Sequence, residues 1–405
     1  MASIAQVWEG EARLMDNAAA QTQVTYKELA RLFLRLSVTA FGGPVAHVAI
    51  AEDEIVQRRQ WLTREHYLDL IAATNLIPGP NSTEVMIHVG YTLRGIPGAV
   101  VTGTCFIVPS FLLTLALGVI YVSTGALPEI NALFWGIKPV IVAIIANAGY
   151  RLMQSALKVR ALWVLFIVSA VIIGLLNVPE VVVMLGAGLV YALYRIQRPQ
   201  ISAWLLMGMQ PLWQTSVTAM ANPSLLDIFA YFLRIGAVLF GSGYVLIAYI
   251  QQDVVNTFGW LTGQQLLDAI AIGQTTPGPV STTAAVVGYI IAGYAGAVVA
   301  TLGIFLPSFF FVILSAPFIP GMRRSPFMSA FLSGVNAGVI AAILITLIDL
   351  THVALLTLDG TQFSPIAIAL AVASLFALVR FQINATWLIA AGGLVGLLVG
   401  WLGVA

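Results

Sequence analysis

Two short segments carry side chains whose types and spacing favour binding of an anion. Each is a Pro-Gly-Pro turn with hydroxyl or amide side chains within the next three residues, Pro78-Gly-Pro-Asn-Ser-Thr and Pro277-Gly-Pro-Val-Ser-Thr. Proline suits the first helical turn, and a helix start offers free N–H groups and a partial positive charge that bind anions without a cationic side chain. The alternative is a helix cap beside a tight turn, but two copies favour binding. The anion-binding candidates are Asn81, Ser82, Thr83, Ser281, Thr282 and Thr283.

Ionisable residues near the first turn are suited to proton transfer. Glu84 and His88 are four residues apart, on one face of the helix expected after the turn, and His47 and Asp69 precede it. A carboxylate and an imidazole beside an anion site take up and release protons near neutral pH, which would couple anion movement to a proton gradient. The alternatives are a polar pair that stabilises a packed helix and a metal site, for which neither His-x-x-x-His nor a cysteine cluster is present.

Composition places these residues in a membrane protein. Of 405 residues, 60% are hydrophobic and 9% are charged, whereas about a quarter of the residues of soluble domains are charged. Several apolar runs, such as 331–350 and 386–404, reach the ~20 residues that a helix needs to cross a hydrocarbon core of about 30 Å. We therefore expect an all-α, polytopic membrane protein in contact with the lipid bilayer.

An internal repeat relates the two turns. Segments recur at an offset of 199, as in Trp61-Leu-Thr and Trp260-Leu-Thr, and after a one-residue slip Pro109-Ser-Phe matches Pro307-Ser-Phe. Shared hydrophobicity does not produce matches of this density, so the chain is a duplicated unit. The predicted organisation is a polar tail (1–26), a first repeat (27–198), a charge-free linker (199–225) and a second repeat (226–405).

Positive charge predicts that the second repeat is inverted relative to the first, because basic residues mark short cytoplasmic loops. The loop after the helix near 97–124 has no Lys or Arg, and the next loop has Arg151, Lys158 and Arg160. In the second repeat the equivalent of the uncharged loop carries Arg323 and Arg324. Inverted repeats are common in secondary transporters, which bind substrate near the midplane at interrupted helices.

Each repeat has two candidate breaks, which we interpret as hinges. Phe41-Gly-Gly-Pro and its counterpart Phe240-Gly-Ser-Gly interrupt one long helix each, and every Pro-Gly-Pro turn lies between short apolar segments. Such segments are too short to span a bilayer, so each pair forms a re-entrant hairpin or one broken helix. The hinge candidates are Gly42, Gly43, Pro44, Gly241, Gly243, Pro78, Gly79, Pro80, Pro277, Gly278 and Pro279.

Three cations are further candidates for holding the anion. Arg35 and Arg234 each lie inside an apolar helix, and Lys138 lies within a later apolar stretch. Charge in hydrocarbon is costly, so such residues usually face a cavity and have a partner. The two arginines attract the anion, snorkel to a headgroup or pair with a carboxylate. Asp69 and Asp268, which also repeat, are candidates for that pairing or for capping a short helix.

Other function classes lack a signal. The net charge of +1 does not suggest a nucleic-acid partner, and the absence of Gly-x-Ser-x-Gly and His-Glu-x-x-His argues against an intramembrane enzyme. We therefore expect no catalytic residue, no cofactor and no metal site. A homodimer is compatible with the sequence, which carries no signal for oligomeric state.

The combined motifs resemble the chromate ion transporter family. The resemblance rests on Phe41-Gly-Gly-Pro-Val-Ala-His, Gln57-Arg-Arg-Gln-Trp-Leu and Pro78-Gly-Pro-Asn-Ser-Thr-Glu, and it covers nearly the whole chain as a member with both halves on one polypeptide. It implies export of chromate across the bacterial cytoplasmic membrane, driven by the membrane potential or by a proton gradient as in an antiporter. Sulfate is the structural analogue of chromate. A sulfate or other small-oxyanion transporter and a passive anion channel are the alternatives.

Overall fold

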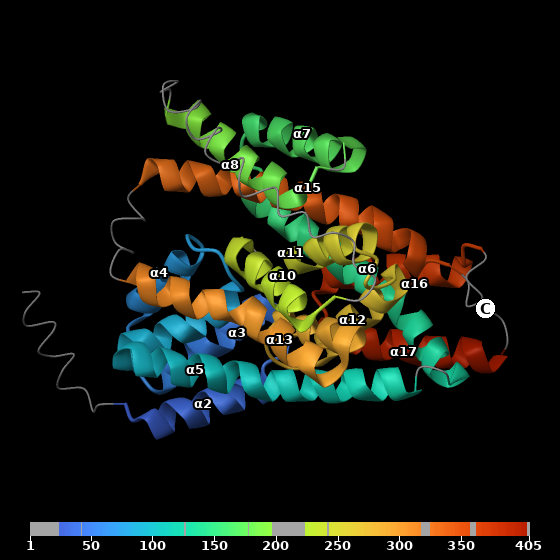
Figure 1. Cartoon of the computed structure of the whole chain (residues 1–405), viewed down its shortest axis with the longest axis horizontal. Helices are drawn as coiled ribbons and strands as arrows, with labels where there is room; N and C mark the ends of the chain where they lie inside the picture. Colours follow the sequence, from blue (N-terminus) through green and yellow to red (C-terminus); the bar gives the residue numbers. More distant parts are fainter. Residues whose placement is uncertain are drawn as a thin grey trace, which may run out of the picture.

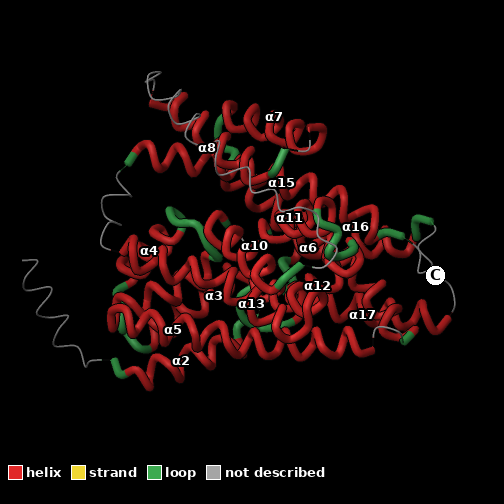
Figure 2. The backbone as a smooth tube through the Cα atoms, in the orientation of Figure 1, coloured by secondary structure: helices red, strands yellow, loops and turns green. Residues whose placement is uncertain are grey.

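The computed structural model describes residues 24–41, 43–124, 127–176, 178–196, 223–240, 243–316, 325–356 and 362–402. Figure 2 shows helices connected by loops throughout these ranges, where one isolated β-bridge joins Leu356 to Phe363. The predicted tail up to residue 23, most of the predicted linker, and the hinge candidates Gly42 and Gly241 lie outside the described residues.

The two repeats form helices in the same order. The first contains α2 (Tyr26–Thr39), α3 (Gly43–Glu52), the π-helix η1 (Asp53–Arg58), α4 (Arg64–Thr74), α5 (Asn81–Thr124), α6 (Pro128–Ala156), α7 (Arg160–Leu176) and α8 (Glu180–Ile196). The second contains α10 (Leu225–Val238), α11 (Val245–Tyr249), the π-helix η4 (Ile250–Thr257), α12 (Gly263–Thr275), the 3-10 turn η5 (Val280–Thr282), α13 (Thr283–Ser315), α15 (Pro326–Ala354), α16 (Pro365–Phe381) and α17 (Ala385–Leu402).

Five helices of the described ranges are long and apolar enough to cross a membrane. They are Asn81–Thr124, Pro128–Ala156, Val280–Ser315, Pro326–Ala354 and Ala385–Leu402. Large apolar side chains are exposed on the outside of the molecule, with Leu175 75% and Trp401 85% accessible. A lipid environment accommodates such a surface, so the prediction of an all-α, multi-pass membrane protein is confirmed.

Equivalent capping residues begin the first helix of each repeat. Thr25 and Ser224 accept hydrogen bonds from the backbone N–H groups of Glu28 and Asp227, and each carboxylate binds back to its cap. A reciprocal capping box satisfies N–H groups that would otherwise have no partner at the helix start. The duplicated sequence therefore begins both helices in the same way.

The helices that follow the Pro-Gly-Pro turns are each folded into a hairpin. Gly95 and Gly293 adopt φ values of +65° and +63°, which interrupt α5 and α13. A side chain at Gly90 would meet the backbone of Gly98, so the helix before the break packs against the helix after it. In the first repeat the break thus separates a short helix, 81–93, from a longer helix, 96–124.

The two repeats exchange their last helices. α7 and α8 pack against α15 of the second repeat, and α16 and α17 pack against α6 of the first. Glycines allow the backbones to approach closely, as where Gly136 faces Gly392 and Gly396. Figure 1 shows α5 ending at the right of the molecule and α13 ending at the left, so these equivalent helices run in opposite directions. This arrangement places both Pro-Gly-Pro turns at the interface of the repeats.

Candidate functional site

Each Pro-Gly-Pro turn is held by the helix break of the other repeat. The amide of Gly79 donates to the carbonyl of Leu239 at 2.7 Å, and the amide of Gly278 donates to the carbonyl of Ala40 at 3.1 Å. Ala40 follows the end of α2 and Leu239 follows the end of α10, at equivalent positions of the repeat. These reciprocal hydrogen bonds bring the two turns and the two breaks together.

A cavity of about 330 Å³, called here the central cavity, lies where these segments meet. Pro80, Asn81 and Ser82 line it from the first turn, and Val280 and Ser281 line it from the second. Pro44 and Gly243 line it from the two breaks, and Ile71, Thr74 and Asn75 line it from the end of the α4 segment. The start of α5 and the start of η5 therefore face one shared space.

The polar groups of the central cavity are neutral. Amides and hydroxyls line it from Thr74, Asn75, Asn81, Ser82 and Ser281, and none of the described residues that line it is charged. The hydroxyl of Ser281 is buried and has no hydrogen-bond partner within the described ranges. Backbone N–H groups at a helix start have no partner inside the helix and carry partial positive charge. The cavity can therefore stabilise an anion through N–H and O–H donors without a carboxylate that would repel it.

Three of the predicted anion-binding residues lie outside the cavity lining. The hydroxyl of Thr282 donates to the carbonyl of Pro279 at 2.8 Å, and that of Thr283 donates to Val280 at 2.8 Å. Thr83 is fully buried, and its hydroxyl has no partner among the described residues. Asn81, Ser82 and Ser281 are thus the predicted side chains that reach the central cavity.

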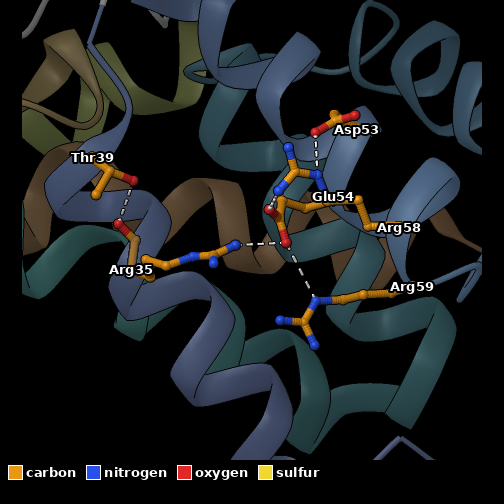
Figure 3. Close-up of polar contacts among 6 residues, drawn as sticks. All are labelled: Arg35, Thr39, Asp53, Glu54, Arg58 and Arg59. Carbon is orange, nitrogen blue, oxygen red and sulfur yellow. Dashed lines mark hydrogen bonds and ion pairs between the residues drawn. The ribbon is translucent and has the colours of Figure 1, made fainter.

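Arg35 and Arg234 lie in equivalent ion pairs away from the cavity lining. Arg35 contacts Glu54 at 2.6 Å, and Arg234 contacts Asp253 at 2.8 Å. Figure 3 shows that Glu54 also faces Arg58 and Arg59, at 3.3 Å and 3.5 Å. Of the alternatives predicted for these arginines, pairing with a carboxylate is the one that the structure shows.

The carboxylates of these pairs differ from Asp69 and Asp268, the predicted candidates for the pairing. Glu54 and Asp253 both follow their arginine by 19 residues and lie in the π-helices η1 and η4. π-Helical turns are rare and frequent at functional sites. The equal spacing in both repeats is the sequence signal that would have identified them.

Lys138 forms a buried ion pair across the two repeats. Its Nζ lies 3.3 Å from Asp268 Oδ1, and both side chains are nearly inaccessible to solvent. Tyr121 of α5 donates a hydrogen bond to the other carboxylate oxygen at 2.8 Å. The alternative that Asp268 pairs with Arg234 is therefore wrong. Lys138 neutralises a carboxylate of α12 and does not line the central cavity.

Glu84 and His88 are buried one turn apart in the helix 81–93. Both oxygens of the Glu84 carboxyl lack a hydrogen-bond partner in the described part of the chain, and so does His88 Nε2. A side chain at Gly79 would meet the Glu84 carboxyl and, at 2.8 Å, the hydroxyl of Ser308. The Glu84 carboxyl therefore lies against the first Pro-Gly-Pro turn and is not part of the lining of the central cavity.

The other two predicted proton-coupling residues have different surroundings. His47 Nε2 lies 3.0 Å from the carbonyl of Ala40, and the ring contacts Phe106 edge-on at 5.7 Å. His47 thus supports the break that holds the second turn. Asp69 is exposed on α4 and has an interaction partner of its own.

The predicted hinges are breaks in the helices where they are described. α2 ends at Thr39 and α3 begins at Gly43, whose φ is +78°. Gly79 and Gly278 have φ values of +147° and +93°, a conformation that only glycine adopts readily. Their motion stays a prediction. Within the described ranges no group of three or more His, Cys, Asp or Glu residues could hold a metal ion.

Comparison with known proteins assigns this architecture to a family. A profile of the chromate transporter family matches residues 27–192 and 226–397. A chromate transport protein of Cupriavidus metallidurans is 32% identical over 92% of this chain and 93% of its own length. One of Pseudomonas aeruginosa is 31% identical over 93% of both chains.

A probable chromate transport protein of Synechococcus elongatus is 32% identical over 78% of this chain and 82% of its own length. No solved structure matches the chain. Because the family profile matches both repeats and these relatives align over most of their length, the chain belongs to the chromate transporter family.

Proposed function

We propose that this protein is a secondary active transporter that exports chromate across the bacterial cytoplasmic membrane. The observation that carries the proposal is the central cavity, where Ser82 and Ser281 and two helix starts converge without an acidic side chain. Hydroxyl and N–H donors arranged around a small cavity suit a tetrahedral dianion, and helix starts are general anion-binding elements. The names of the three relatives support chromate as the cargo.

The arrangement of the helices supports alternating access. The equivalent helices α5 and α13 run in opposite directions, and the broken segments of both repeats meet at the central cavity. In inverted-repeat transporters such a site lies near the midplane, and one repeat moves against the other around it. We therefore place the two repeats in inverted orientation in the membrane, with the Pro-Gly-Pro segments as re-entrant hairpins and the breaks at 41–44 and 240–243 as hinges.

Coupling to protons is the energy source that the structure supports. Glu84 is buried against the first turn without a hydrogen-bond partner among the described residues, in contact range of Gly79. Burial makes the charged form of such a carboxyl costly, and an anion bound at the turn makes that form costlier still. Binding of the anion would therefore favour uptake of a proton. Glu84, with His88 in the next turn, is therefore the proposed coupling group.

Transport into everted membrane vesicles tests the proposal. Vesicles that contain the protein should accumulate radiolabelled chromate when energised, with saturation kinetics and with loss of accumulation after addition of an uncoupler. Accumulation equal to that of vesicles without the protein would refute chromate export. Flux that neither saturates nor responds to the uncoupler would identify a passive channel.

Sulfate is a second candidate cargo, because the lining of the cavity is neutral. Hydroxyls and amides recognise the charge and shape of a tetrahedral oxyanion, and these features are shared by chromate and sulfate. Sulfate should therefore compete with chromate in the vesicles. Strong sulfate transport with no chromate transport would assign the same site to sulfate.

A further inference from the structure

A second cavity adjoins the central one. This outer cavity of about 490 Å³ is lined by α6 of the first repeat, by both breaks, and by the connection between α16 and α17. Pro44 lines both cavities, and Gly243 of the central cavity is followed by Tyr244 of the outer one. The described residues of the two breaks therefore contribute to both spaces. A Cβ atom placed on Gly43 would lie 3.7 Å from the Tyr244 hydroxyl oxygen, so the two breaks are close together.

Arg151 is the charged residue of the outer cavity. The remaining polar lining is neutral and includes Asn147, Ser155, Gln382 and Asn384. Arg151 has no ion-pair partner in the part of the chain that the structure describes, whereas Arg35, Arg234 and Lys138 all do. Its side chain is exposed and lies within electrostatic reach of Tyr244. An uncompensated guanidinium thus faces the space that leads to the central cavity.

We propose that the outer cavity is an entrance site for the transported oxyanion, in which Arg151 captures the anion before it passes the two breaks into the central cavity. This inference rests on the proposed function. The loop after α6 carries Lys158 and Arg160, and basic loops of this kind face the cytoplasm. The entrance therefore opens on the side from which an exporter takes its cargo. Fixed charge at a cleft raises the local concentration of an oppositely charged ligand.

The equivalent place in the second repeat has the opposite charge. The position that corresponds to Arg151 is Asp349, at the offset of 198 that also relates Gly136 to Gly334. Asp349 and Asp253 both interact electrostatically with Glu180, the first residue of α8. In the outer cavity the corresponding place is taken by Ala385, the first residue of α17. The positions related by the repeat therefore carry opposite charges, Arg151 in the first and Asp349 in the second.

Kinetics in everted vesicles test the entrance, because their cytoplasmic face is outward. Arg151→Gln should raise the KM for chromate about three- to tenfold and leave the maximal rate within about twofold, since the residue acts on capture and not on the central cavity. Arg151→Lys should keep a KM near that of the unchanged protein. Arg160→Gln, an exposed arginine at the start of α7 outside the cavity, is the matched control and should change neither constant.

Ionic strength supplies an independent test. The KM of the unchanged protein should rise when an impermeant salt is increased from about 20 to about 200 mM, because screening weakens attraction to Arg151. The KM of Arg151→Gln should respond much less. An unchanged KM in Arg151→Gln, or a KM of the unchanged protein that is insensitive to salt, would overturn the entrance site. Both results leave the proposed function standing, whereas absence of chromate uptake by the unchanged protein would refute that function itself.

Discussion

Ser110 and Ser308 hold equivalent positions in the two repeats, but only Ser110 has a hydrogen-bond partner among the described residues: its hydroxyl donates to the Pro277 carbonyl at 2.6 Å. The hydroxyl of Thr282 likewise donates to the Pro279 carbonyl, whereas its counterpart Thr83 has no side-chain partner in the described ranges. Among the described residues, the carbonyls of the second Pro-Gly-Pro turn therefore accept side-chain hydrogen bonds from Ser110 and Thr282, whereas the equivalent hydroxyls of the first repeat make none. We therefore expect the turn beside Glu84 to be the one that responds to protonation.

Glu84→Gln should flatten the pH dependence of chromate transport, because it removes a titrating group and keeps the size of the side chain. The measurement is the initial rate of uptake into everted vesicles between about pH 5.5 and 8.5, around the range in which coupling carboxyls and imidazoles titrate. Glu65→Gln, at an exposed position in the first turn of α4, is the control and should keep the original profile. If Glu84→Gln kept the pH profile of the unchanged protein, Glu84 would not be the coupling residue.

Ser82→Ala and Ser281→Ala should each weaken chromate binding, and the double variant should weaken it more than either alone. A hydrogen bond to a charged group is worth about 1.5 kcal/mol, so each loss should raise the KM about tenfold. The measurement is the concentration dependence of uptake, with the amount of protein in the membrane determined in parallel. Ser123→Ala is the control, because that exposed hydroxyl donates to the Ile120 carbonyl outside the cavity. A double variant with an unchanged KM would place the anion elsewhere.

The pairing of the two turns follows from the sequence, since a repeat at one offset sets two helix starts in equivalent positions. The two ion pairs could also be predicted from the sequence, because Arg35–Glu54 and Arg234–Asp253 share a spacing of 19 residues. The roles of Glu54 and Asp253 were nevertheless missed. A charged residue inside an apolar helix is conspicuous in the sequence, as Arg35 and Arg234 are. The π-helices that carry the two carboxylates have no periodic pattern by which the sequence would predict them.

Other features depend on contacts that sequence does not encode. The exchange of the last helices between repeats places Asp268 beside Lys138, and no spacing in the chain indicates that meeting. The breaks at Gly95 and Gly293 lie within continuous apolar runs, so periodicity does not detect the hairpins. Which hydroxyls face the cavity also depends on small rotations of a helix, as the different surroundings of Ser281 and Thr282 show.

Gly278→Ala should destabilise the protein by about 1–3 kcal/mol, because a side chain there is strained and overlaps its surroundings. The φ of Gly278 is +93°, and a Cβ would meet the Ser110 hydroxyl and lie 3.3 Å from the Ser37 carbonyl. The measurement is thermal unfolding in detergent. Gly186→Ala is the control: no atom lies near its Cβ position, so the helix propensity of alanine should leave stability unchanged or slightly higher. Equal melting temperatures for both variants would contradict the close packing of the second turn.

Arg35→Gln should act on stability and not on anion affinity, because Arg35 pairs with Glu54 outside the cavity. Glu54→Gln should destabilise the protein more, since it leaves Arg35, Arg58 and Arg59 without their shared carboxylate (Figure 3). The double variant should lose less than the sum of the two single losses, as expected for groups in contact. Thermal unfolding and the KM for chromate are measured on all three. A raised KM with unchanged stability in Arg35→Gln would instead favour attraction of the anion.

Lys138→Asn tests whether the buried lysine holds the anion or only balances a carboxylate. The change gives the residue that the second repeat has at this position, Asn336, and leaves Asp268 buried with Tyr121 as its remaining partner. Breaking a buried ion pair costs about 3–5 kcal/mol, so the single variant should be poorly folded. Adding Asp268→Asn removes the unpaired charge and should restore folding. If Lys138 only neutralises Asp268, the double variant should also transport chromate with the original KM, whereas a raised KM in the folded double variant would assign Lys138 to the anion.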